Sequence, residues 1–369
     1  MHPDRFSGLS TRQTDMAMAE LAFLPLISAE FPGIGGIIKK VPDHFKVEER
    51  LPYGACGEGE HVYITFRRSG WNTVDAARAM QKALNVSPSD VGWGGRKDKT
   101  AVVTQTFSFR LGVHAALAEV RARLSGLPFE ILEINRHLNK IKTGHVAANR
   151  FTILVCQPVS DAFSKAQTIA RHLSRTGIPN FYGPQRFGHQ FQNVEKGFSL
   201  MRPDRKIRKD DFLVSVVQSA LFNIWLKNRM ETGNYHRLLA GDIVRKTDTG
   251  GMFDVLDPVV EGERFERREI IYTGPMYGFK MKPAQADAGA RETELLNRFG
   301  FTLDDFRRFR APGSRREAIL FLSDLEIRPV EENLEFSFTL PSGAYATTVL
   351  REFMHVTDDQ GACRDPVFI

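Results

Sequence analysis

Patterns typical of β-strands lie toward both ends of this chain, and helical patterns lie between them. Val62, Ile64 and Phe66 alternate along one early segment, and strict alternation returns from Leu334 to Leu340. Alternation of this kind is typical of a strand with one buried face. The order of the patterns predicts an α+β protein in which a sheet domain is interrupted by an insertion and closed by a strand near its end.

The predicted boundary before the insertion is Gly177-Ile178-Pro179, which ends a helical pattern. Helical spacing then predicts a long buried helix through Leu213, Val217, Leu221, Ile224 and Trp225. Two segments of the insertion, Gly250-Gly251 and PAQADAGA (283–290), are expected to be loops. We therefore predict an N-terminal extension (1–35), a sheet domain (36–179 and 322–369) and a helix-rich insertion (180–321).

Composition is that of a globular protein with a modest excess of positive charge. The 369 residues include 50 Lys and Arg against 44 Asp and Glu, a net charge of +6. This excess favours a polyanionic partner. The three cysteines form no CxxC pair, so we expect neither disulfides nor a zinc site, and a cytoplasmic setting. The apolar segment 16–27 is interrupted by Glu20 and Pro25, so no membrane span is expected.

The segment GGRKDKTAVVTQTFSFR, residues 94–110, is the strongest candidate for chemistry. Glycines followed by alternating apolar residues predict a tight turn that leads into a half-buried strand. Asp98 then lies at the rim of a sheet between Lys97 and Lys99. A carboxylate is ionised at neutral pH and can act as a nucleophile without a base, and nearby ammonium groups keep it ionised. By local pattern alone, a solvated turn aspartate is the commoner outcome.

Two nucleotide-binding interpretations fail. A P-loop needs a glycine before Lys99-Thr100, where this chain has Asp98. The sequence Gly33-Ile34-Gly35-Gly36 lacks the third glycine spacing of a dinucleotide fingerprint.

Five motifs, in one order, resemble those of the TruD family of tRNA pseudouridine synthases. The resemblance runs from about residue 36 to 356. GRKDKTAVVTQ resembles the family's G-x-K-D-x-x-A-x-T-x-Q, and NFYGPQRFG resembles N-Y-F-G-x-Q-R-F-G. AANRF resembles G-N-x-F, and LPSGAYATTVLREFM resembles L-P-x-G-x-F-A-x-x-x-x-R-E. KKVPDHFKVEE, followed by GEGEHVYITF, resembles the family's opening strand and turn.

The resemblance implies a mostly antiparallel pseudouridine synthase domain with an inserted TRUD domain. It implies that Asp98 is the catalytic aspartate, with Lys39 a further active-site residue. Four residues are implied to bind the target uridine or line its pocket: Phe45, Asn149, Phe151 and Tyr345. The implied substrate is tRNA, typically at uridine 13, with no cofactor, no metal and no protein partner, in a monomer.

Four departures from the family pattern concern substrate fit more than the reaction. Val103 replaces a threonine, Ala148 a glycine and Tyr345 a phenylalanine, and Phe181-Tyr182 inverts an aromatic pair. None of them removes the aspartate or the motif asparagine.

The expected chemistry breaks the C1′–N1 bond of uridine and rejoins the uracil through C5. Asn149 is able to read a uracil edge, Phe151 or Tyr345 to stack on the base, and Lys39 to keep Asp98 ionised. Phe151 is, on pattern alone, as easily a core residue. Several basic residues are predicted to contact phosphates, with plain surface charge as the alternative: Lys97, Arg186, Arg205, Lys206, Arg208 and Lys209.

Two other functions stay open at this stage. One is a non-catalytic RNA-binding protein or RNA chaperone on the same scaffold. The other is a hydrolase that pairs Asp98 with a second carboxylate, for which Glu58 and Glu60 are candidates only by composition.

Overall fold

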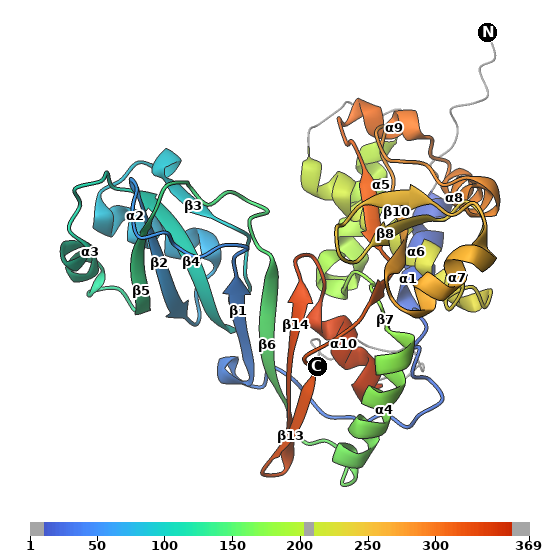
Figure 1. Ribbon diagram of the computed structural model, residues 1–369, viewed down its shortest axis with the longest axis horizontal. Helices are drawn as coiled ribbons and strands as arrows, with labels where there is room; N and C mark the ends of the chain where they lie inside the picture. Colours follow the sequence, from blue (N-terminus) through green and yellow to red (C-terminus); the bar gives the residue numbers. More distant parts are fainter. Residues whose placement is uncertain (1–10, 203–209, 356–369) are drawn as a thin grey trace. The chain divides into compact units, whose positions relative to one another are not determined.

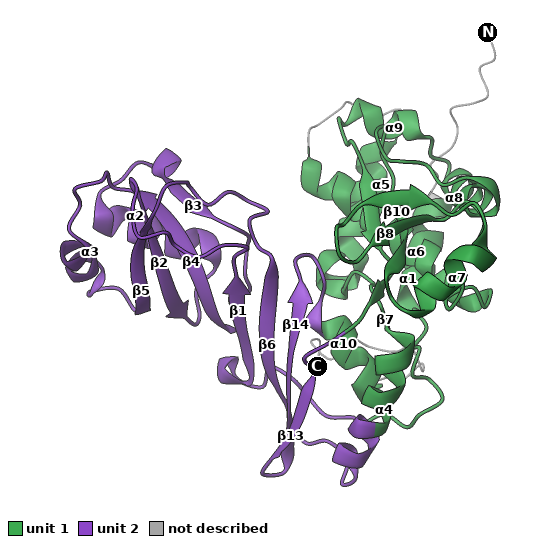
Figure 2. Cartoon of the chain, viewed as in Figure 1, with its two compact units in different colours: residues 1–33, 168–321, 347–368 green, residues 34–167, 322–346, 369 purple. Residues whose placement is uncertain are grey.

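The structure, a computed structural model, describes residues 11–202 and 210–355 (Figure 1). The described chain divides into two compact units, each built from separated segments (Figure 2). Unit 1 is formed by 11–33, 168–202, 210–321 and 347–355, and unit 2 by 34–167 and 322–346. Unit 1 thus contains the predicted insertion together with α1, most of helix α4 and nearly all of α10.

Unit 2 is organised around an eight-stranded sheet. Its strands are β1 (Phe45–Arg50), β2 (His61–Arg68), β3 (Val91–Trp93), β4 (Val102–Arg110), β5 (Glu130–His137), β6 (Ala148–Val155), β13 (Glu326–Val330) and β14 (Asn333–Pro341). The order is β13-β14-β6-β1-β4-β2-β5, with β3 paired to β4. Only the β1–β4 pair in this sheet is parallel. The predicted α+β class and mostly antiparallel sheet are confirmed.

The late strand β14 joins the sheet through β6. Leu340 pairs with Asn149, and Phe338 pairs with Phe151. On its other edge β6 pairs with β1, where Glu49 lies opposite Asn149. Directly opposed residues of antiparallel strands share a face, so three strands bring their side chains to one surface at this point.

Two helices cover one part of the sheet of unit 2. Helix α2 (Thr73–Leu84) begins at Asn72, whose side chain accepts a 2.9 Å hydrogen bond from the Asp75 amide, and it ends at Asn85 with a left-handed backbone. Helix α3 (Leu117–Leu124) follows β4, and two 3₁₀ turns, Pro42–His44 and Pro88–Asp90, precede β1 and β3. The buried face of α2 packs with Phe66, Phe107 and Phe109 of the sheet.

Unit 1 surrounds the buried helix α6. Its helices are α1 (Thr11–Ala22), α4 (Ala162–Thr176, beginning in unit 2), α5 (Gln192–Met201), α6 (Asp211–Glu231), α7 (Pro258–Glu266), α8 (Ala286–Arg298), α9 (Leu303–Arg308) and α10 (Ala346–Met354). Helix α6 packs against α1, α5, α8 and β10. It is buried on nearly every side, and its buried residues include the polar Gln218, Asn223 and Arg229.

Unit 1 also contains strands that the patterns did not indicate. A four-stranded sheet has the order β11-β10-β8-β9, formed by β8 (Ile243–Lys246), β9 (Met252–Asp254), β10 (Ile270–Met276) and β11 (Ser314–Glu317). A short pair joins β7 (Ile178–Pro179) to β12 (Ile319–Leu320). The expected loop at 283–290 is wrong in its second half, because α8 begins at Ala286.

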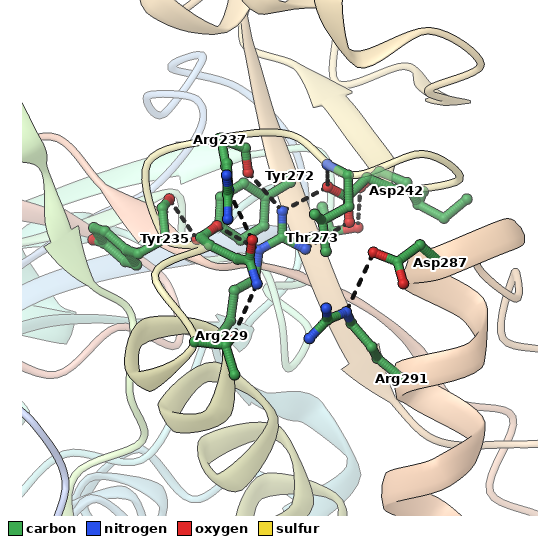
Figure 3. Close-up of polar contacts among 12 residues, drawn as sticks. Arg229, Tyr235, Arg237, Asp242, Tyr272, Thr273, Asp287 and Arg291 are labelled. Carbon is green, nitrogen blue, oxygen red and sulfur yellow. Dashed lines mark hydrogen bonds and ion pairs between the residues drawn. The ribbon is translucent and has the colours of Figure 1, made fainter.

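A buried ion pair ties α6 to the loop before β8 (Figure 3). The guanidinium of Arg229 donates to both oxygens of Asp242, at 2.7 and 2.6 Å, and lies 3.9 Å from the centroid of the Tyr272 ring. Arg229 and Asp242 side chains are only 4% and 2% exposed. Two parallel charge-assisted hydrogen bonds compensate for removing both charges from water.

The N-terminal segment is anchored within unit 1. Helix α1 packs on α5 and α6, and Ser28 donates a 2.6 Å hydrogen bond to the buried carboxylate of Glu352 on α10. Burial raises the pKa of Glu352, although Arg351 and Ser28 oppose that effect. Across residues 11–202 and 210–355, no helix combines the length and the apolar character needed to cross a membrane.

Candidate active site

The loop from Gly94 to Thr100 connects β3 to β4 and is fixed to unit 2 at three points. The Gly94 carbonyl accepts from the Gly144 amide at 2.8 Å, and the Gly95 carbonyl accepts from Gln105 Nε2 at 2.7 Å. The Lys97 amide donates to Thr73 Oγ1 at 2.8 Å. A Cβ at Gly94 would lie 2.5 Å from Val146, so only glycine permits this approach. The loop is therefore held by its backbone.

Asp98 is half exposed at the end of this loop and is paired with Lys39. Lys39 Nζ lies 2.8 Å from Asp98 Oδ2, and the amide and hydroxyl of Thr100 each donate to Oδ1 at 3.1 Å. Burial raises the pKa of Asp98, but Lys39 and Thr100 outweigh it and hold that pKa below its ordinary value. The carboxylate is therefore ionised at neutral pH, and 48% of its side chain is exposed.

Lys39 reaches Asp98 from an uncommon backbone conformation. Its φ is 58°, a left-handed value that non-glycine residues seldom adopt and that tends to occur at functional sites. Its ammonium also lies 4.3 Å from the centroid of the Phe45 ring, and its side chain is 12% exposed. The cation is thus held between an aromatic ring and the carboxylate.

The two predicted phenylalanines lie side by side on β1 and β6. The rings of Phe45 and Phe151 meet edge to face at 6.0 Å between centroids, and Phe151 also contacts Phe338 at 5.8 Å. Phe45 is 5% exposed and Phe151 is 8% exposed. Both phenylalanines are therefore packed in the core, and only a small part of each residue is exposed.

Asn149 is joined to the loop through Lys97. Lys97 Nζ donates to Asn149 Oδ1 at 2.5 Å and lies 3.0 Å from Glu49 Oε2. Tyr345 is partly exposed in the turn between β14 and α10. That turn begins beside Asn149, because Leu340 pairs with it. The structure thus gathers the predicted residues of unit 2 on one part of its sheet.

Sequence reasoning missed a buried polar group beneath the loop. Arg68 is 2% exposed and donates to the Trp71 carbonyl, to Thr73 Oγ1 at 3.2 Å and to Gln105 Oε1 at 3.4 Å. Burial lowers the pKa of Arg68 to about 10, against the opposing effect of Asp98 and Glu49. Glu49 and Gln105 belong to motifs quoted above, so the signal was present but no role was assigned to it.

The predicted phosphate contacts fall into three groups. The ammonium of Lys97 is directed to Glu49 and Asn149 and is 10% exposed, so its role is internal. Arg186 donates to Ser215 at 2.7 Å and Ser219 at 3.2 Å, both on α6. The remaining four lie outside the described residues: Arg205, Lys206, Arg208 and Lys209.

Of the two carboxylates considered as a partner for Asp98, Glu60 is paired with a basic residue of β4. Glu60 Oε2 accepts from Arg110 at 2.9 Å. Among the described residues, no group of three or more His, Cys, Asp or Glu side chains is placed to hold a metal ion.

Comparisons with known proteins show the family to which this chain is related. The family model described as tRNA pseudouridine synthase D (TruD) matches residues 25–206 and 205–353. A tRNA pseudouridine synthase D of Anaeromyxobacter dehalogenans is 42% identical over 340 residues, 89% of this chain and 96% of the relative. One from Thermus thermophilus is 38% identical over 336 residues, covering 90% and 92%.

A solved structure shares the fold. A crystal structure of a tRNA pseudouridine synthase D from Methanosarcina mazei superimposes with a TM-score of 0.71 at 21% identity, covering 91% of this chain and 97% of that chain. The mixed sheet, the structural similarity and the family match together define a pseudouridine synthase fold. The chain belongs to the TruD family.

Proposed function

We propose that this protein converts a uridine of tRNA, most typically uridine 13, to pseudouridine, with Asp98 as the nucleophile. The relatives' names support the reaction and the substrate. The observation that carries the role of Asp98 is its pairing with Lys39, which keeps a half-exposed carboxylate ionised on a loop held by its backbone.

The reaction is an isomerisation that needs no external reagent. The C1′–N1 bond breaks and a C1′–C5 bond forms, while the C5 proton leaves and N1 gains a proton. Whether the carboxylate attacks at C6 or at C1′, the reaction requires an ionised and accessible oxygen. The half-exposed side chain of Asp98 supplies one. Lys39 holds Oδ2 and Thr100 holds Oδ1, so the side chain is oriented before substrate arrives.

The base must leave its stack to reach Asp98, at a cost of a few kcal/mol. Asn149 and Tyr345 are proposed to receive the extruded uracil, together with the accessible parts of Phe45 and Phe151. Binding of the tRNA backbone to basic residues offsets the cost of extrusion.

The test is Asp98→Asn, which keeps the shape of the side chain and removes its charge. Pseudouridine mapping across total RNA, with and without the protein, identifies the substrate. We expect Asp98→Asn to abolish tritium release from C5-labelled uridine while tRNA affinity stays within about tenfold of the parent.

The matched control is Asp90→Asn, which changes an aspartate of a 3₁₀ turn in the same unit and should leave the rate unchanged. Loss of tRNA affinity in step with activity would make Asp98 a structural residue. A parent protein that binds tRNA and releases no tritium would be a non-catalytic RNA-binding protein.

A further inference from the structure

Asn149 is held from the interior of unit 2 by a residue whose chemistry determines how its amide lies. Lys97 Nζ donates to Asn149 Oδ1 at 2.5 Å. The Lys97 side chain is 10% exposed, whereas Asn149 is only partly buried. The ammonium of Lys97 therefore contacts the Asn149 amide from the covered side, and part of the Asn149 residue remains exposed.

An ammonium group can only donate hydrogen bonds. The amide atom that faces Lys97 must therefore be the carbonyl oxygen, and the opposite orientation would bring two donors together. The amide nitrogen of Asn149, with its two N–H groups, is then directed away from Lys97. In the described parts of the chain, no hydrogen bond is recorded from this nitrogen.

Glu49 keeps Lys97 in this position. Its side chain is fully buried, and Oε2 lies 3.0 Å from Lys97 Nζ. Gln105 Nε2 donates to the same carboxylate at 3.2 Å, and β-sheet register places Glu49 directly opposite Asn149. A buried carboxylate needs its cation close by, so the ammonium cannot turn away without a large cost. Glu49 thus holds Lys97 in place, and Lys97 in turn fixes the orientation of the Asn149 amide.

We propose that Lys97 is a specificity-determining positioning residue, which makes Asn149 present N–H donors to O4 of the target uracil. Uracil and cytosine differ at C4, where uracil has a carbonyl acceptor and cytosine an amino donor. An N–H donor fixed at this position can bond to O4 of uracil. With cytosine the same N–H would face the amino group at C4, which is also a donor. This inference rests on the proposed function for the identity of the base.

The experiment measures equilibrium binding of a tRNA whose modified uridine has been mapped. The target position carries uridine, cytidine or pyrimidin-2-one, which lacks a substituent at C4. Both analogues also lack the N3 proton of uridine, so the C4 contact is measured by how the preference changes between protein variants. All proteins carry Asp98→Asn, so that uridine is not converted. With Lys97 and Asn149 intact, we expect uridine RNA to bind roughly tenfold more tightly than either analogue, the effect of one unmatched hydrogen-bond donor.

Two variants change the proposed contact in different ways. In Glu49→Gln with Lys97→Met, no buried charge is left alone and the amide is free to turn, so the preference should fall below about twofold. In Asn149→Asp, an oxygen replaces the donor, so the preference should shift toward cytidine. Lys46→Met is the matched control. This exposed lysine lies on β1, and its side chain lies on the opposite face of the strand from Glu49. It should keep the parent's preference.

The results separate this inference from the proposed function. An unchanged uridine preference in both test variants would overturn it and leave Lys97 with a structural role only. Failure of the protein with native Asp98 to form pseudouridine in any RNA would instead refute the proposed function.

Discussion

Lys97→Met removes a cation from a carboxylate that solvent does not reach. Lys97 Nζ and Glu49 Oε2 are 3.0 Å apart, and the Glu49 side chain is fully buried. At an effective dielectric constant near 20, their attraction is about 5 kcal/mol, before the cost of burying both charges. Removing one partner of a buried pair costs about 3–5 kcal/mol in practice.

The other bonds to Glu49 reduce this cost. Gln105 Nε2 at 3.2 Å and the Thr106 amide at 3.5 Å remain as donors to its carboxylate. They continue to stabilise the carboxylate after the ammonium is removed, so the cost falls toward the lower end of this range. We therefore expect Lys97→Met to lower the free energy of unfolding of unit 2 by about 3 kcal/mol. Adding Glu49→Gln removes the uncompensated charge and should recover most of that loss.

Hydrogen exchange measured by mass spectrometry assigns the effect to one unit. Peptides from β4 and β6 report on unit 2, and peptides from α6 report on unit 1 as an internal control. The single variant should increase exchange in β4 and β6 only, and the double variant should restore protection. A single variant that loses less than about 1 kcal/mol, or a double variant no better than the single, would refute the reasoning.

Three further predictions concern other charged groups. In Lys39→Met the ammonium no longer opposes the effect of burial, so the pKa of Asp98 rises. The acidic limb of the kcat/KM profile should therefore move to higher pH. An acidic limb that stays in place would contradict the role of Lys39 in keeping Asp98 ionised. Burial raises the pKa of Glu352 above 4.5, so its stabilising contribution is present below pH 4.5 and lost as pH rises through the folded-state pKa. Glu352→Gln should therefore gain in Tm relative to the parent as pH rises, and a constant difference would count against this linkage. Arg229→Met should destabilise unit 1 by about 3–5 kcal/mol in α6 hydrogen exchange, whereas Arg291→Met, in an exposed pair, should cost under about 1 kcal/mol.

Sequence patterns predicted the elements of unit 2 well because its strands alternate. Leu334 to Leu340 was predicted as a strand that closes the first sheet, and β14 pairs with β6. Periodicity states which face of a strand is buried, but it does not state which strand is the neighbour. The parallel pairing of β1 with β4 therefore required the structure.

Unit 1 shows where such patterns fail. Strand β9 has three residues, and β11 has the sequence Ser-Arg-Arg-Glu, so neither shows apolar alternation. Helix α8 begins in a run of alanines and a glycine, whose small side chains give a weak helical period. In these elements tertiary packing determines the backbone conformation, and local preference contributes little.

The candidate site shows the same division. The motifs led to Asp98, Lys39 and Asn149, and Lys97 was predicted as a phosphate contact. The inward direction of the Lys97 side chain depends on Glu49, which lies on β1 and is distant in sequence from the loop that carries Lys97. The sequence around a lysine in a basic run does not indicate which acidic residue it will contact, because that contact depends on how the strands pair in the sheet.

The pairing of β6 with β14, and of α1 with α6, has a consequence for synthesis of the chain. Ribosomes add about 5–20 residues per second. Helix α1 cannot pack against α6 until residues 211–231 have been synthesised. The open edge of β6 cannot pair with β14 until residues 333–341 have been synthesised. An unpaired strand edge is a template for association with other chains. During synthesis this protein therefore passes through a stage, lasting on the order of ten seconds or more, in which the edge of β6 that later pairs with β14 is open to other chains.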